Sequence, residues 1–197
     1  MVVERLITNL VYSNNNLLTP GAGSLGFTVI RMNSCFDPEE GLGGGQPTYH
    51  DQIAAMYKRY RVLGAKITCH FSYPSGITAG IGPAICGIQC SDVNTIPTSD
   101  VGVVMSLPNT SYAMLSPNGD PVTVVATYSA KNTYPNQDQD LTAAVTANPT
   151  LPWLAKIFAG STGGTDTTGI QMVYVIEYRR SIVTGKQIGR ASCRERV

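Results

Sequence analysis

Three groups of residues in this sequence have the types and spacing that binding or catalysis could use. The first is residues 21–26, GAGSLG, which fit the GxGxxG pattern of dinucleotide-binding loops. Such a loop has to lead into a helix, because the helix N-terminus holds the pyrophosphate. The residues that follow, Phe27 to Ile30, favour a strand. We therefore interpret the glycines as a turn.

The second group is the cysteines and histidines. Cys86 and Cys90 are four residues apart, but no second pair of ligands completes a zinc site. Cys69 and His70 are neighbours, and neighbouring side chains on a strand point to opposite faces. No motif of the GxSxG kind accompanies the two histidines, His50 and His70, so the sequence supports neither a Ser-His-Asp nor a Cys-His catalytic site. We predict no enzymatic activity, no metal, no cofactor, and reduced, buried thiols.

The third group is a basic cluster around Tyr57 and Tyr60, made of Lys58, Arg59, Arg61 and Lys66. A strand is predicted over residues 57–73. Its core-facing positions are expected to be Leu63, Ala65, Ile67, Cys69, Phe71 and Tyr73, and its polar face Lys66, Thr68, His70 and Ser72. Cations on such a face can contact phosphates without reading sequence. We predict Lys58, Lys66 and His70 as DNA-facing; the alternative is a solvated sheet face.

The elements that position these residues are mostly strands. Apolar residues recur with period two, which is typical of half-buried strands. Strands are predicted over residues 5–13, 25–33, 57–73, 83–90, 111–115, 122–128, 141–145, 153–159 and 169–180. Helical spacing occurs once, at Ile53, Met56, Tyr57 and Tyr60, with Asp51 as the expected cap. Nothing alternates strand with helix, so we predict an all-β fold: an eight-stranded antiparallel jelly-roll sandwich with one short helix in a loop.

The composition limits the class of protein. The chain has 197 residues, of which 43% are hydrophobic and 14% charged. This length suits one domain with a substantial core, and so few charges favour association with a partner. No run of about 18 apolar residues occurs, so no membrane span is expected.

The last residues differ in composition from the rest. Residues 188–197, IGRASCRERV, can be encoded by a common short-read sequencing adapter up to its stop codon. We interpret residues 187–197 as a non-native tail and residues 1–186 as the domain. Without the tail, three arginines and one glutamate drop out, and the net charge changes from +1 to −1. Cys193 drops out as well.

The segment 32–71 carries a series of short motifs: Asn33-Ser34, Asp37-Pro38, the glycine-rich residues 41–45, Gln46-Pro47, and then Tyr57, Tyr60 and Val62. This series resembles the capsid proteins of circular, Rep-encoding single-stranded DNA viruses, the circovirus-like group. The resemblance implies a jelly roll that self-assembles into a small icosahedral T=1 shell around circular single-stranded DNA. Such a shell has about 60 copies, as icosahedral symmetry requires. It also implies a virion protein that assembles in the host nucleus or cytoplasm. No membrane partner is expected, because the sequence has no membrane-spanning run.

The resemblance also implies where copies meet. The loop from Asp37 to Pro47 is expected at the surface of a subunit contact, through Asp37, Pro38, Gln46 and Pro47. Apolar loop residues are expected to add to the interface by burial: Ile77, Ile81, Val103, Met105 and Tyr112. Family members begin with an arginine-rich arm, whereas a strand here starts almost at Met1, so we expect this chain to package DNA weakly.

The competing interpretation is a monomeric β-sandwich module that binds a carbohydrate or another ligand. It requires exposed aromatic residues around one concave face. The ten tyrosines permit this, but Trp153 is the only tryptophan and lies in a predicted strand.

Overall fold

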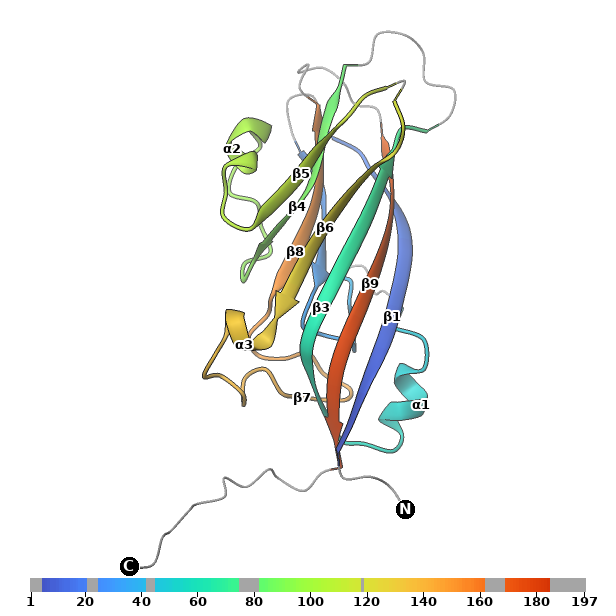
Figure 1. Cartoon of the computed structure of the whole chain (residues 1–197), viewed down its shortest axis with the longest axis vertical. Coiled ribbons are helices and arrows are strands. Elements are labelled where there is room, and N and C mark those ends of the chain that lie inside the picture. Colours follow the sequence, from blue (N-terminus) through green and yellow to red (C-terminus); the bar gives the residue numbers. More distant parts are fainter. Residues whose placement is uncertain are drawn as a thin grey trace, which may run out of the picture.

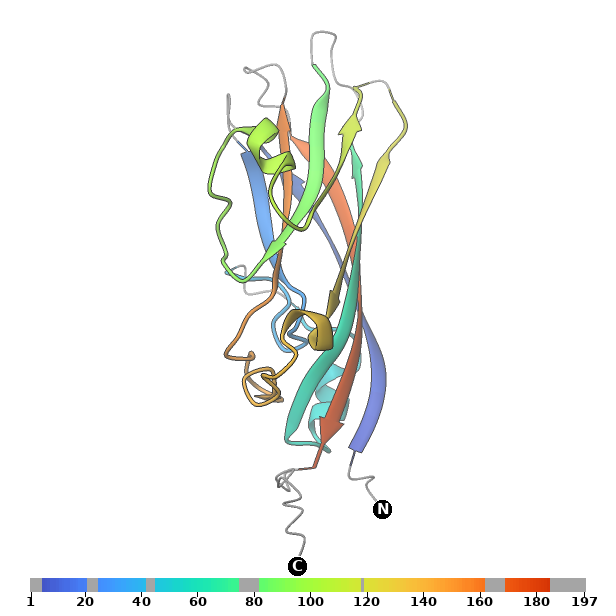
Figure 2. The same cartoon turned by 60° about the vertical axis from the view of Figure 1, so that its left-hand side comes forward.

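The computed structural model of the protein describes residues 5–20, 25–41, 45–74, 82–117, 119–161 and 169–184. Two antiparallel sheets stack face to face (Figures 1 and 2). The first sheet has the order β1 (Arg5–Leu18), β9 (Ile170–Val183), β3 (Arg59–Ser72), β6 (Val122–Ser129), and β7 (Ala143–Ala144) pairs with the start of β3. The second has the order β2 (Leu25–Arg31), β8 (Leu154–Ser161), β4 (Ala84–Ser91), β5 (Thr110–Leu115).

The pairing of the eight longer strands defines the topology. The chain folds back on itself as one long double ribbon, in which β1 pairs with β9, β2 with β8, β3 with β6 and β4 with β5. The ribbon is rolled up so that β9 also meets β3 and β8 also meets β4. This arrangement is a jelly roll. The predicted fold class is confirmed, and the expected strand over 141–145 shortens to the two residues of β7.

The core lies between the sheets and follows the alternation of the strands. Ile170, Met172, Tyr174, Ile176 and Tyr178 of β9 are each at most 1% exposed, as their shared face predicts. They belong to one cluster with the inner faces of the other long strands. Because each strand contributes alternate residues, the opposite face of the first sheet is left to solvent.

A β-bulge in β3 changes which residues reach the core. The register against β9 shifts between Val62 and Gly64, leaving Leu63 as the extra residue. Tyr60 and Val62 are buried before the bulge, and Ala65 and Ile67 after it. Leu63 is only partly buried, so its expected place on the core face is wrong. A prediction that assumes strict alternation along the strand does not allow for an inserted residue.

The described residues contain three short helices rather than the single one expected: α1 (His50–Ala54), α2 (Val101–Met105) and α3 (Ala130–Thr133). Asp51 does not cap α1. The cap position is Tyr49, in the left-handed region at φ 69°, without a side-chain hydrogen bond. The helix ends before Met56. Among the described residues, no helix is long and apolar enough to cross a membrane.

The outer face of the second sheet is covered by the segment that contains α2. Val104 of α2 packs on Ile85 and Phe158, which point outward from β4 and β8. Glycine is needed beneath this contact, because a Cβ on Gly87 would lie 2.6 Å from Phe158 Cζ. Figures 1 and 2 show α2 beside β4 and β5. The sandwich thus has one covered and one open outer face.

Candidate assembly and nucleic-acid surfaces

The open outer face of the first sheet carries most of the exposed positive charge that the strands provide. The cations on this face come from three neighbouring strands: Arg5, Arg59, Arg61, Lys66 and Arg179. Glu177 is the only carboxylate among the residues of these strands that point outward. The remaining outward positions are a mixture of threonine, serine and asparagine with exposed apolar residues such as Ile7, Val11 and Val173. A surface of this kind attracts polyanions through its charge, not through any base-specific pocket.

The predicted DNA-facing residues lie differently on this face. Lys66 is exposed and sits between Glu177 of β9 and Thr127 of β6. His70 is exposed too, and its Nδ1 lies 2.8 Å from the Thr123 hydroxyl on β6. Lys58 is exposed but precedes the first residue of β3. Arg59 and Arg61 point to the open face, so strand alternation would turn their neighbour Lys58 to the opposite side.

Carboxylates gather on the other side of the molecule. Asp92 and Asp100 belong to the segment that covers the second sheet, and Asp100 caps α2 through Gly102 N at 2.8 Å. Glu40 reaches the same segment through Asn94 Nδ2 at 3.4 Å. Glu40 also lies 3.8 Å from Arg31 Nη2, so part of this negative charge is paired. Asp92 and Asp100 form no ion pair among the described residues and add unpaired carboxylates to the covered side.

A lysine is buried beneath the covering segment. Lys156 points outward from β8 yet is 0% exposed. Its Nζ donates to Ser91 Oγ and to Val93 O, the latter at 2.8 Å. Burial lowers the pKa of this ammonium, while Cys90 and Asp92 nearby act in the opposite direction. The lysine fixes the start of the covering segment and is not available to a ligand.

Apolar side chains stay exposed around α2. Val103 is 47% exposed and Tyr112 48%, and Met105 is partly buried. Met114, which the sequence did not single out, is 59% exposed beside them on β5. Val103, Met105, Tyr112 and Met114 form what we call the α2 patch. Ile77 and Ile81, the other apolar residues predicted at an interface, lie outside the described residues.

The loop after β2 folds back on the chain instead of standing free. Arg31 N donates to Pro38 O at 2.7 Å, and Arg31 Nη1 pairs with Asp37 at 2.8 Å. Pro38 and Pro47 are buried within the chain, whereas Asp37 and Gln46 are partly exposed. The expected surface loop is thus wrong for the two prolines. Backbone bonds to β2 hold Pro38 down, and Pro47 accepts a hydrogen bond from His50 N at the start of α1. A subunit contact through Asp37 and Gln46 stays a prediction.

The same loop carries a buried carboxylate that sequence reasoning missed. Glu39, 4% exposed, accepts hydrogen bonds from Tyr12 OH at 3.0 Å, Asn14 Nδ2 at 2.6 Å and Tyr174 OH. Burial, followed by the Glu39 carboxylate, raises the pKa of both phenols, so they remain donors. The glutamate ties the loop to β1 and β9. In the sequence, Glu39 is one acidic residue in a polar loop. Nothing there distinguishes it from the more exposed acidic residues nearby.

The cysteines behave as predicted. Cys35, Cys69, Cys86 and Cys90 are free and buried. Burial raises the pKa of Cys86 to about 12 and that of Cys90 to about 11. Cys69 faces the core while His70 faces solvent. Among the described residues, no group of three histidines, cysteines or carboxylates could hold a metal ion.

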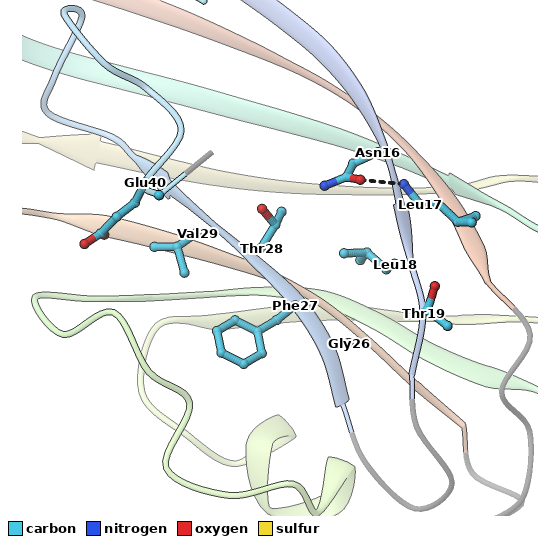
Figure 3. A pocket seen from close by; sticks show the side chains of 10 residues that line it. Asn16, Leu17, Leu18, Thr19, Gly26, Phe27, Thr28, Val29 and Glu40 are labelled. Carbon is cyan, nitrogen blue, oxygen red and sulfur yellow. Dashed lines mark hydrogen bonds between the residues drawn. The ribbon is translucent and has the colours of Figure 1, made fainter. Parts of the chain in front are cut away.

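One pocket of about 320 Å³ opens at the seam where the edges of the two sheets meet, between the end of β1 and the start of β2 (Figure 3). Asn16 lies on one side of Thr28 and Glu40 on the other, and the Asn16 amide oxygen is engaged by Leu17 N at 2.8 Å. The polar groups do not converge on a ligand position. Trp153 lies perpendicular to Tyr134, packs against the core and is only partly exposed.

The comparisons with known proteins found similarity of structure only. No protein-family model matches the chain, and no curated protein matches it. The 60-mer BFDV capsid protein is 8% identical, with a TM-score of 0.49, covering 91% of this chain and 94% of that one. The decameric BFDV capsid protein is 9% identical, with a TM-score of 0.45, covering 90% and 98%. The protein of Cocksfoot mottle virus is 13% identical, with a TM-score of 0.49, covering 92% and 96%.

Proposed function

We propose that the protein is the subunit of a viral capsid that self-assembles into an icosahedral shell around single-stranded DNA, with no enzymatic role. The observation that carries the proposal is the difference between the two outer faces of the jelly roll. One face is open and carries exposed cations; the other is covered, carries carboxylates and is bordered by the α2 patch. A shell subunit needs such a difference, because one side meets the genome and the other side does not.

The contacts between copies are proposed to use the α2 patch together with the partly exposed Asp37 and Gln46. Exposed Val103, Tyr112 and Met114 would be removed from water there, which gives the driving force for association. Closed symmetry then limits the shell to a fixed number of copies, about 60 for the simplest icosahedron. The location that follows is the virion, after assembly in the host nucleus or cytoplasm.

The test is assembly of the purified chain. Sedimentation velocity should show one fast-moving species of narrow size, and electron microscopy should show rounded shells of uniform diameter. A chain that stays monomeric at every concentration and salt condition contradicts the proposal. It would favour the alternative of a monomeric binding module.

Packaging is tested separately from assembly. Shells recovered from cells should have a higher 260 to 280 nm absorbance ratio than shells assembled from nucleic-acid-free subunits, and the DNA inside should survive nuclease treatment. Few cations line the open face, so we expect weak binding of DNA and a filled fraction that falls with salt along a shallow slope. Shells that form but never protect DNA leave assembly intact and remove the packaging role.

A further inference from the structure

A shallow hollow of about 480 Å³ lies on the open face, at the β-bulge of β3. Its lining comes from β1, β3 and β9 and includes Asn9, Gly64, Lys66, Glu177 and Arg179. The hollow exists because Gly64 has no side chain where the neighbouring outward positions do. Arg179 stands directly across from Gly64 on β9, and Asn9 stands across from Arg179 on β1.

The two cations of the hollow can reach one point above Gly64. Lys66 is two residues beyond Gly64 on β3, so Lys66 and Arg179 form a diagonal pair across neighbouring strands. Diagonal neighbours are about 7–8 Å apart, which long side chains can span. A tetrahedral anion over the glycine would therefore meet a guanidinium on one side, an ammonium on the other and the Asn9 amide beyond.

Both cations lack an ion-pair partner among the described residues. Within the described part of the chain, Arg31 and Arg61 form ion pairs with Asp37 and Asp138, at 2.8 and 2.6 Å. Lys66 and Arg179 have neither an ion pair nor a side-chain hydrogen bond there. Glu177 is the direct neighbour of Lys66 but forms no ion pair with it.

We propose that this hollow seats one backbone phosphate of single-stranded nucleic acid, with Arg179 and Lys66 as its ligands and Gly64 as its floor. The inference rests on the proposed function, since it names the contact by which the open face holds the genome. Compared with the residues predicted from the sequence, the proposed seat uses Arg179 in place of Lys58. Lys58 is not placed on the open face by the alternation of β3, and Arg179 was not predicted to contact DNA. Glu177 opposes binding, because its carboxylate lies beside the seat.

The experiment measures binding of a labelled oligothymidylate of about 12 nucleotides, a length within single-strand site sizes. Fluorescence anisotropy is recorded over a salt series for the full chain and its variants. Lys66→Gln and Arg179→Gln should each weaken binding, and the double variant should flatten the salt slope by about 0.7, the value of one lost phosphate contact on a single strand. Glu177→Gln should strengthen binding. The three arginines after residue 186 are present in every variant, so their contribution is common to all.

Lys131→Gln is the matched control, because Lys131 is an exposed cation outside the hollow. It should keep the affinity and slope of the parent chain. The proposed phosphate seat would be overturned if Lys131→Gln and Arg179→Gln changed the affinity equally. Weaker binding by Glu177→Gln would also overturn it, and so would a parent chain that does not bind the oligothymidylate. Shell formation, followed by electron microscopy in the same samples, reports on the proposed function. Shells without the predicted pattern refute only the seat, and a chain without shells refutes the proposed function.

Discussion

His50 Nδ1 accepts a hydrogen bond from Arg180 Nη1 at 3.0 Å, and both side chains are buried, at 1% and 0% exposure. The other ring nitrogen, Nε2, carries the proton and donates to Val145 O at 3.0 Å. The contact joins α1 to the end of β9, near the edge where the described chain begins and ends (Figure 1). A neutral imidazole is required, because a second cation would face the guanidinium.

We expect the stability of the protein to fall as the pH drops from 7.5 to about 5.5, around the ordinary histidine pKa of about 6.5. Burial, together with Arg180, lowers the pKa of His50, although Val145 O and Asp51 act in the opposite direction. The unfolded chain then binds the proton at a higher pH than the folded chain. The stabilisation that neutral His50 provides is therefore fully present above the histidine pKa of the unfolded chain. It is lost as the pH falls below that value.

Urea unfolding at several pH values measures this effect, at concentrations where the subunits stay dissociated. His50→Gln cannot take up the proton, so its stability should be lower at pH 7.5 but nearly independent of pH in this range. His70→Gln is the control, because His70 is exposed on the open face, and it should keep the parent's pH dependence. An unchanged pH dependence in His50→Gln would show that another group is responsible.

The burial of Arg180 could be predicted only in part from the sequence. The alternation that places Tyr174, Ile176 and Tyr178 on the core face of β9 places Arg180 next on the same face. That signal was available, but an arginine at the end of a strand is normally expected in solvent. Burial comes from α1, which is far away in the sequence and covers the end of the sheet. Within the described part of the chain, the Arg180 guanidinium Nε and Nη2 have no hydrogen-bond partner.

The strands were largely predictable, because periodicity is a local property of the chain. The features that position the candidate surfaces were not. The hollow depends on a bulge at Leu63, and the covered face depends on α2, a short run of valines that intrinsic propensity assigns to a strand. Asp100 as its N-cap was the available signal.

The Glu39 network predicts a large cost for a small change. Tyr174→Phe removes one of three donors to a buried carboxylate and should lower the free energy of unfolding by about 1.5–3 kcal/mol, the range for hydrogen bonds to charged groups. Urea unfolding at pH 7.5 measures it. Tyr49→Phe is the control, since Tyr49 is 66% exposed, and it should change stability little. A cost for Tyr174→Phe no larger than that of the control would show that the network contributes nothing to stability.

The close packing of α2 on Gly160 of β8 predicts that a larger residue there would loosen the helix. A Cβ on this residue would lie 2.4 Å from Val101 Cγ2 and 2.6 Å from Leu25 Cδ2. Gly160→Ala should therefore displace the start of α2 and destabilise the chain by about 1–3 kcal/mol, as overpacking does. Hydrogen exchange should speed up in residues 100–107. Gly82→Ala is the control, because no atom lies within 4 Å of the added Cβ. Slow exchange in Gly160→Ala would mean that Val101 moves aside without loosening the helix.

The α2 patch predicts a variant that folds but does not assemble. Val103 is 47% exposed while its neighbour Val104 is 0% exposed, so a charge at Val103 enters solvent and leaves the core contact intact. Val103→Lys should keep the circular dichroism spectrum and unfolding midpoint of the parent chain. It should also lose the fast-sedimenting particles, because a lysine buried at a subunit contact without a partner is costly.

Val125→Lys is the matched control for assembly. Val125 is 39% exposed, but it lies on the open face of β6, which the proposed shell turns toward the genome. This variant should form shells of the parent's size, and the added positive charge should favour DNA inside them. Assembly by Val103→Lys would remove the α2 patch from the subunit contact. Loss of assembly by Val125→Lys alone would place the contact on the open face, and the basic surface would then lie between subunits instead of facing the genome.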